Sequence, residues 1–171
     1  VCFATVLPYG ENWHNAAFNE SILKEIEKYR QYAAKYGFIF VRNLHDLSLC
    51  IRGEAKGLLL HLEGMNAFCG TVADWHLLDM LFNAGVRSIG IVHTEKNFLG
   101  GGNKDSETGL TELGRKVLRW CINKGVIIDL AHMNTKTFFE SARILQEYSL
   151  PLFVSHGNAY AVCVNDRNYN D

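Results

Sequence analysis

Three features of the 171-residue sequence predict an α/β fold with a parallel sheet. Short apolar runs recur along the chain without period-2 alternation, which is typical of strands buried on both faces. Segments with apolar residues at helical spacing lie between these runs. Strand and helix therefore alternate about every 25–40 residues, as in the βα unit. Right-handed crossovers leave two architectures, a doubly wound open sheet or a (β/α) barrel, and periodicity does not choose between them.

The expected strands and helices can be placed from these runs and from ordinary punctuation. The strands are expected over residues 1–7, 57–62, 87–92, 126–130 and 152–155. The helices are expected over residues 19–36, 46–55, 74–84, 111–124 and 134–148. Thr111 precedes one helix as an N-cap, and Gly37, Gly85 and Gly125 follow three of them.

The composition is that of an ordinary folded protein. It is 48% hydrophobic and 20% charged, enough apolar content for a core, and the length predicts a single domain over residues 1–171. The formal net charge is -1 without a basic run, which argues against nucleic acid as a partner. No apolar stretch reaches the ~18 residues of a membrane span. The five cysteines show no CxxC spacing, so we expect reduced, mostly buried thiols, as in a cytoplasmic protein.

Polar residues stand at the points where four of the apolar strands end. They are one carboxylate and three imidazoles: Glu63, His93, His132 and His156. Because the carboxyl ends of parallel strands meet on one rim, where such enzymes keep their active sites, we expect these side chains to converge. Carboxylate and neutral imidazole are the usual ligands of a catalytic zinc, which activates water near neutral pH. This chemistry favours a metal site, and we predict a functional role for Glu63, His132 and His156 together.

A structural role is the alternative for each of these residues alone. A single histidine at a strand end is more often a hydrogen-bonding cap, and Glu63 could cap a helix N-terminus. Four such residues at successive strand ends are harder to explain structurally, because burying them unpaired would be costly.

Further candidates carry weaker signals. Arg167 follows the His156 strand on the same rim and could bind a substrate carboxylate through two parallel hydrogen bonds, although a surface salt bridge fits its spacing equally well. The run of glycines at 100–102 matches no nucleotide-binding pattern, so we expect a flexible loop there. A serine–histidine–aspartate triad is not supported, because Ser155 lies beside His156 without a nucleophile-elbow pattern.

Short motifs occur in a fixed order along the chain: Leu62-Glu63-Gly64, Ala84-Gly85-Val86-Arg87, Val92-His93 with Asn97, Gly109-Leu110-Thr111 with Gly114, Asp129-Leu130-Ala131-His132, Ser155-His156 with Asn158-Ala159, and Arg167-Asn168 with Asp171. Together they resemble the membrane (renal) dipeptidase family, which are zinc peptidases of the amidohydrolase superfamily. The resemblance is close from about residue 57 to residue 171. It is looser before that, where residues 1–8 resemble the family's second barrel strand. Each motif alone is weak, whereas their order and spacing together are specific.

The resemblance implies a (β/α)8 barrel of the TIM type that hydrolyses the amide bond of a dipeptide with a metal-activated hydroxide. It implies that Glu63 bridges two zinc ions and that His132 and His156 bind the second ion. It also implies that His93 is catalytic, contacting the substrate carbonyl and the tetrahedral intermediate. Arg167 then binds the C-terminal carboxylate of the dipeptide, so that His93 and Arg167 are the expected substrate-binding residues.

The sequence departs from the family pattern in three places. No His-x-Asp pair for the first zinc precedes residue 1, and no late aspartate follows residue 171. We therefore expect about strands two to six of the barrel, with one zinc or none in this chain alone. Further segments or a second copy of the chain would complete such an open barrel. His61 stands where the family has a small residue, and a polar contact inside the barrel is its favoured role.

Two alternatives to a dipeptidase stay open at this point. One is another amidohydrolase reaction on a small carboxylate-bearing amide or lactam. The other is a non-catalytic barrel remnant that serves as a scaffold or binding module, and the missing His-x-Asp pair and late aspartate favour it.

Overall fold

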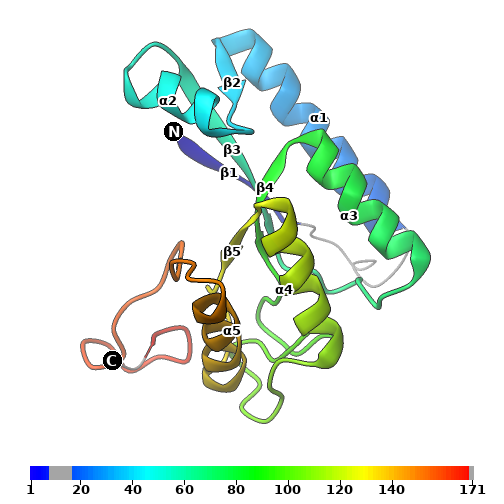
Figure 1. Cartoon of the computed structure of the whole chain (residues 1–171), viewed down its shortest axis with the longest axis vertical. Helices are drawn as coiled ribbons and strands as arrows, with labels where there is room; N and C mark the ends of the chain where they lie inside the picture. Colours follow the sequence, from blue (N-terminus) through cyan, green and yellow to red (C-terminus); the bar gives the residue numbers. More distant parts are fainter. Residues whose placement is uncertain (8–16, 170–171) are drawn as a thin grey trace. The chain divides into compact units, whose positions relative to one another are not determined.

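The computed structural model describes residues 1–7 and 17–169 of the chain (Figure 1). Asp171, from the last sequence motif, lies outside the described residues. The chain divides into two compact units: unit 1 is Val1–Glu63 with Gly70–Ser88, and unit 2 is Gly64–Cys69 with Ile89–Asp171. The expectation of a single domain over residues 1–171 stays a prediction.

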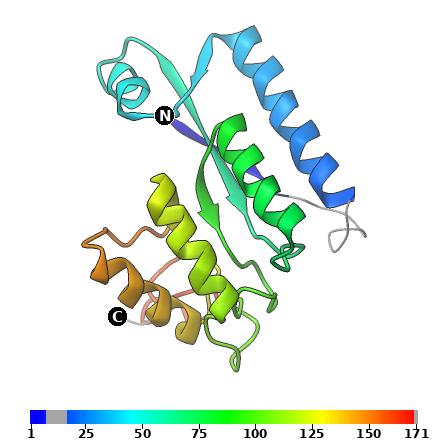
Figure 2. The ribbon, with the colours of Figure 1, turned by 45° about the vertical axis from the view of Figure 1, so that its right-hand side comes forward.

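Unit 1 is built around a central parallel strand. β1 (Cys2–Val6) and β2 (Phe38–Phe40) both pair in parallel with β3 (Lys56–Glu63). Its helices are α1 (Ala17–Tyr36), α2 (Leu44–Ile51) and α3 (Val72–Ala84). Both ribbon views place α3 beside α1 (Figures 1 and 2).

Unit 2 contains the end of β4 (Val86–Gly90), followed by α4 (Glu112–Lys124), β5 (Ile127–Asp129) and α5 (Thr135–Glu147). The helices α4 and α5 lie side by side in both views and are joined by an ion pair of 2.6 Å between Arg115 and Glu140 (Figures 1 and 2). The strand order of the sheet is β1-β3-β4-β5, with β2 also paired to β3.

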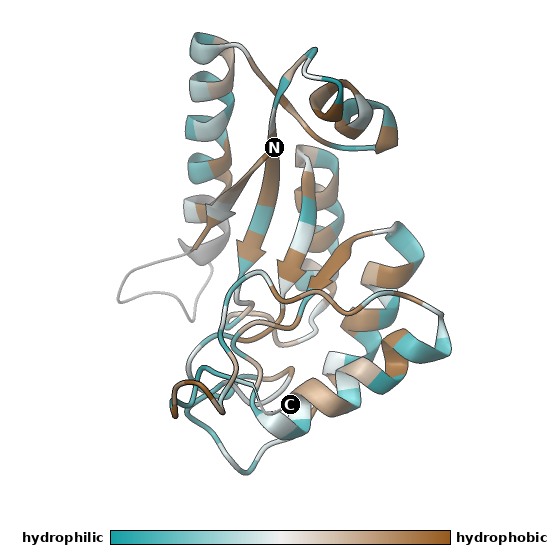
Figure 3. Ribbon diagram, turned by 90° about the vertical axis from the view of Figure 1, so that its left-hand side faces the viewer, coloured by the Kyte–Doolittle hydropathy of each residue, from teal (hydrophilic) through white to brown (hydrophobic). Residues whose placement is uncertain are grey.

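The burial of β3 confirms the interpretation of the apolar runs. Its residues from Gly57 to Leu62 are all buried in succession, so both faces of the strand are covered. The strands are accordingly coloured mainly as apolar segments in Figure 3. The largest fully buried core side chains of unit 1 are Val6, Ile22, Ile26, Leu60, Leu62, Leu78 and Leu81, and those of unit 2 are Ile89, Ile91, Leu99, Leu118 and Leu130.

The helix ends follow the local signals in the sequence. Thr71 caps α3 and forms a capping box with Asp74, while Thr111 and Asn134 cap α4 and α5 through their side-chain oxygens. Gly85 and Gly125 end α3 and α4 in the left-handed region, with φ of 116° and 68°. Because these signals act within one turn of helix, sequence alone locates them well.

Other local expectations were wrong or incomplete. Residues 152–155 form no regular strand, because Phe153 makes only an isolated parallel bridge with Asp129. The helix expected to reach residue 55 ends at Ile51, since the chain turns at Gly53 with a φ of 76°. The strand β2, of three residues, was not predicted.

Two predictions about packing were also wrong. Of the five cysteines only Cys121 is buried, and burial raises its pKa to about 12. The glycines at 100–102 form a buried, close-packed segment and not a loose loop. A Cβ at Gly102 would collide with the carbonyl oxygens of His93, Thr94 and Glu95, so this position requires a residue without a side chain.

None of the helices in the described part of the chain is both long and apolar enough to cross a membrane.

Candidate metal centre

The predicted site residues stand at or just beyond strand ends. In unit 1, Glu63 is the last residue of β3 and is half-buried. In unit 2, His93 lies in the loop after β4, and His132 follows β5 and is 6% exposed. His156 and Arg167 lie further on, in exposed segments after the bridge at Phe153.

Unit 2 brings its three candidate histidines together. The rings of His93 and His132 have centroids 4.2 Å apart, and those of His132 and His156 are 4.8 Å apart. Ligand nitrogens of His93 and His132 lie within 4.8 Å of each other. The Nε2 atoms of His132 and His156 are only 2.9 Å apart. Side chains from well-separated parts of the sequence therefore meet at one point, as the strand-end argument expects.

Each of these rings contacts a side-chain oxygen through Nδ1. The contacts are His93 with Thr94 Oγ1 at 2.9 Å, His132 with Asn103 Oδ1 at 3.2 Å, and His156 with Ser155 Oγ at 2.8 Å. An amide oxygen only accepts hydrogen bonds, so His132 must donate from Nδ1, which leaves its Nε2 as an acceptor. Metal-binding histidines are commonly anchored in this way through their second nitrogen.

The backbone at His132 supports a site-specific role. His132 has a φ of 66°, a left-handed conformation that costs energy in a residue with a Cβ. The turn is held by a hydrogen bond of 3.3 Å from the Met133 N–H to the Leu130 carbonyl. Such strain, held by the surrounding structure, is typical of functional positions.

Arg167 also reaches the histidines. Its Nη2 lies 3.4 Å from His132 Nε2, so the guanidinium faces the nitrogen that is left as an acceptor. The nearby Tyr169 hydroxyl donates to the Leu130 carbonyl at 3.1 Å, which ties this segment to the end of β5. Burial raises the pKa of Tyr169 to about 12, so the phenol keeps its proton and remains a donor.

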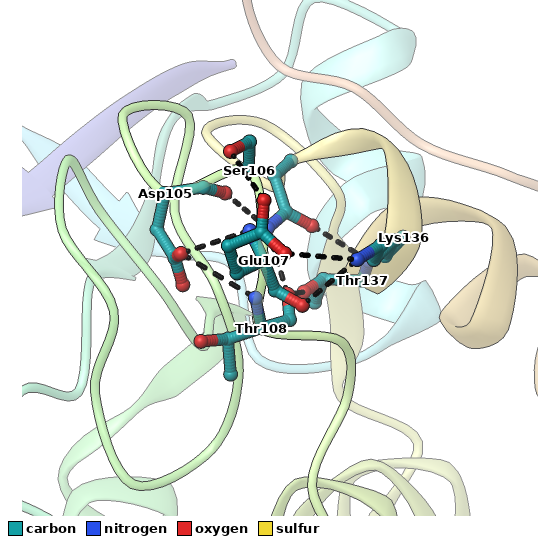
Figure 4. Close-up of polar contacts among 7 residues, drawn as sticks. Asp105, Ser106, Glu107, Thr108, Lys136 and Thr137 are labelled. Carbon is teal, nitrogen blue, oxygen red and sulfur yellow. Dashed lines mark hydrogen bonds and ion pairs between the residues drawn. The ribbon is translucent and has the colours of Figure 1, made fainter.

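A polar loop before α4 carries Asn103, the partner of His132. Figure 4 shows the contacts of Asp105, Glu107 and Thr108 in this loop with Lys136. Asp105 Oδ1 accepts from the backbone N–H groups of Glu107 at 3.0 Å and Thr108 at 3.4 Å. Lys136, in the first turn of α5, donates to the Glu107 carbonyl at 3.0 Å. The side-chain amide of Asn134 donates to the carbonyls of Asp105 and Thr108. The loop is thus tied to the helix N-terminus next to His132.

The polar loop around Asp105 should contribute less to the stability of the fold at low pH. A hydrogen bond from the Thr108 side chain is the main cause that holds the pKa of Asp105 below its usual value. A lowered pKa in the folded state means that the ionised form stabilises the fold above the unfolded-state pKa of ~3.9, and that this contribution is lost as the pH falls further. We expect Asp105→Asn to lower stability at pH 7 by less than about 1 kcal/mol, because the amide oxygen of asparagine can still accept from the N–H groups of Glu107 and Thr108. The variant should also lose less stability than the wild type between pH 4 and pH 2 in urea titrations, and an equal acid loss in both proteins would contradict this.

A cavity of about 360 Å³ opens beside the same loop. Its lining includes Asn103, Asn134, Phe138, Asp166 and Tyr169. Among the described residues, His93, His132, His156 and Arg167 are not part of this lining. The cavity therefore neighbours the histidines through Asn103 but does not contain them.

His61 makes the polar contact that was favoured for it. The side chain is 3% exposed and its Nδ1 lies 3.0 Å from Ser88 Oγ within unit 1.

The side chains that contact the histidines were not predicted as functional from the sequence. Asp129 was named only within a motif, Ser155 was named within a motif and in a triad that was not supported, and Asn103 was not a candidate. Asp129 Oδ2 lies 2.5 Å from Ser155 Oγ, which in turn contacts His156. This arrangement is not a hydrolytic triad, because the serine and not the histidine occupies the middle position.

Comparison with known proteins places the whole chain in a single family. Residues 1–171 match the membrane dipeptidase family, peptidase family M19. An uncharacterized protein of Acinetobacter calcoaceticus is 32% identical over 136 residues, which cover 75% of this chain and 41% of that protein. The chain therefore spans less than half the length of this curated relative.

Solved structures share the fold. A metallo peptidase from Rhodobacter sphaeroides, liganded with a phosphinate mimic of the dipeptide L-Ala-D-Ala, superimposes with a TM-score of 0.80 at 24% identity. An amidohydrolase from Pseudomonas aeruginosa does so with a TM-score of 0.80 at 20% identity. The matches cover 98% of this chain but 55% and 48% of the solved chains. The prediction of an α/β fold that corresponds to part of a TIM-type barrel is confirmed.

Proposed function

Because this chain belongs to the membrane dipeptidase family, we propose that it supplies part of the active site of a zinc-dependent dipeptidase. One observation carries the proposal. The Nε2 atoms of His132 and His156 lie 2.9 Å apart while both Nδ1 atoms contact side-chain oxygens. The acceptor nitrogen of His132 at this distance from a second imidazole nitrogen requires a proton or a metal ion between the two.

The donor set suits zinc. His132 and His156 offer two imidazole nitrogens, and Glu63 offers a carboxylate, the ligand types of catalytic zinc sites. Glu63 is bonded directly to Gly64, whose N–H donates to the Gly90 carbonyl at 2.9 Å. A Cβ at Gly64 would lie 3.2 Å from the His93 Cβ, so the residue that follows Glu63 packs against His93. Glu63 is proposed as the carboxylate ligand because zinc commonly combines this ligand type with imidazole.

The remaining residues have roles that follow from their chemistry. When bound, zinc supplies a Lewis acid and lowers the pKa of water toward ~7. His93 donates a hydrogen bond to the carbonyl oxygen of the scissile amide as negative charge develops there. Arg167 holds the C-terminal carboxylate of the dipeptide through its planar guanidinium. A dipeptide is the proposed substrate class, supported by the dipeptide mimic in the Rhodobacter sphaeroides enzyme.

The test combines metal content with hydrolysis. The purified full chain, supplemented with zinc and then freed of excess, is analysed for zinc per chain by elemental analysis and assayed against a panel of dipeptides. We expect about one zinc per chain, with hydrolysis in the protein that holds it. A folded protein with no stoichiometric zinc after supplementation would overturn the assignment for these residues.

A further inference from the structure

The buried carboxylate of Asp129 is linked to His156 through the hydroxyl of Ser155. Asp129 is 1% exposed and is surrounded by donors. Its Oδ1 accepts from the backbone N–H groups of Ala131 and Ser155, both at 3.0 Å. Its Oδ2 accepts from the Ser155 hydroxyl at 2.5 Å. Three donors directed at one group suit an ionised carboxylate, which only accepts hydrogen bonds.

These contacts determine the direction of the next hydrogen bond. The single proton of the Ser155 hydroxyl is used on Asp129, so Ser155 Oγ can only accept from its other neighbour, His156 Nδ1, at 2.8 Å. His156 must therefore carry a proton on Nδ1. Its Nε2, which lies 2.9 Å from His132 Nε2, is then the nitrogen that can bind a metal.

We propose that Asp129 and Ser155 are a positioning pair that holds His156 in the tautomer able to bind a metal through Nε2. The inference rests on the proposed function, since it concerns a ligand of the proposed zinc site. Both residues act through His156, and neither is a proposed ligand of the metal. Asn103 does the same for His132 by a single contact, whereas the Asp129–Ser155 pair adds a buried charge.

Asp129→Asn should reverse the donor and acceptor roles in the hydrogen bonds that link residue 129, Ser155 and His156. The two backbone N–H groups at Oδ1 require an acceptor, so the oxygen of the new amide must take that place and its NH₂ group must face Ser155 Oγ. Ser155 then accepts from this NH₂ group and turns its own proton toward His156 Nδ1. His156 is pushed into the tautomer that carries its proton on Nε2, which blocks metal binding.

Ser155→Ala should have a smaller effect, because it removes the control of the tautomer without imposing the wrong one. The double variant Asp129→Asn with Ser155→Ala has no hydroxyl at position 155. The reversed series of hydrogen bonds therefore cannot form. The zinc affinity of the double variant should return to that of Ser155→Ala alone. If the two substitutions only disturbed the packing, their losses of zinc affinity would add in the double variant. A partial rescue therefore separates control of the tautomer from a loss of packing.

Zinc affinity is measured by competition with a chromophoric chelator on the full chain. Changes in residues that support a metal ligand cost about 10–100-fold in affinity. We expect a loss of about 10-fold for Ser155→Ala, about 100-fold for Asp129→Asn, and about 10-fold for the double variant. The matched control is Ser141→Ala, because Ser141 is a buried serine of α5 whose hydroxyl has no hydrogen-bond partner among the described residues. It should bind zinc as the wild type does.

The ¹⁵N chemical shifts of His156 provide a readout that needs no metal. In the metal-free wild type, Nδ1 should show the shift of a protonated ring nitrogen. In metal-free Asp129→Asn it should show that of an unprotonated acceptor, in protein whose circular dichroism matches the wild type.

The outcomes separate the two proposals. A wild type that binds no zinc would overturn the proposed function, while the ¹⁵N shifts would still test the tautomer. A wild type that binds zinc, with Asp129→Asn equal to it in affinity and in Nδ1 shift, would overturn the positioning pair alone. Additive losses in the double variant would also overturn it.

Discussion

Replacing His132 with alanine should abolish stoichiometric zinc binding in the full chain. His132 is the residue on which the centre converges: its ring contacts those of His93 and His156, and its Nε2 faces that of His156 at 2.9 Å. Removal of one ligand from a site with few protein ligands leaves too little binding free energy to retain the ion. Zinc per chain, measured by elemental analysis after gel filtration, should fall from about one to near zero.

A second variant keeps this result distinct from misfolding. His132 has a φ of 66°, so glycine at this position removes the imidazole and also relieves backbone strain. We expect metal-free His132→Gly to be at least as stable in urea as metal-free His132→Ala, and equally unable to hold zinc. The control is His76→Ala, an exposed histidine of α3, which should retain zinc. Retention of zinc by both His132 variants would remove this residue from the ligand set.

Replacing Arg167 with alanine should weaken the binding of a dipeptide carboxylate by about 10- to 150-fold. Hydrogen bonds to charged groups contribute about 1.5–3 kcal/mol, which corresponds to that range. Because the guanidinium would bind substrate and transition state alike, the loss should appear in KM and in the affinity of a phosphinate dipeptide mimic, with little change in kcat. Calorimetric titration of the mimic into the zinc-loaded chain measures the affinity directly.

Lysine offers a sharper comparison at the same position. Arg167→Lys keeps the charge but cannot form two parallel hydrogen bonds, so its affinity should lie between those of the wild type and Arg167→Ala. The control is Arg143→Ala, an exposed arginine of α5, which should bind the mimic as the wild type does. Equal affinity of wild type and Arg167→Ala would assign Arg167 to the protein surface and not to the substrate site.

The elements that sequence analysis located well are those whose signals are local. The caps at Thr111 and Asn134, and the glycine at 125, act through hydrogen bonds within one helical turn, and α4 and α5 begin and end within a residue of the expected positions. The strand β2 was not predicted, and the strand predicted over residues 152–155 is only an isolated bridge. A three-residue strand and an isolated bridge exist only because a neighbouring strand offers backbone partners, as β3 does for Phe38 and β5 for Phe153.

The candidate site also contains features that the sequence suggested and features that it did not. Glu63, His93, His132 and His156 could be proposed from sequence because strand ends in a parallel sheet share a rim. The contacts that orient the rings were not visible there. Asn103 lies 29 residues before His132, and Asp129 lies 26 residues before Ser155, so no short pattern connects them.

The sequence by itself determined the α/β class, the boundaries of α4 and α5, the identity of the histidines and the family resemblance, because apolar periodicity, caps and motifs are properties of neighbouring residues. Only the tertiary structure decided that the glycines at 100–102 are close-packed, that His132 adopts a left-handed backbone, and that Asp129 contacts His156 through Ser155. The physical reason is that hydrogen-bond direction and ring tautomer depend on which donors and acceptors meet in space. That meeting is made by the packing of β5, α5 and the segments around them, and not by any one stretch of the chain.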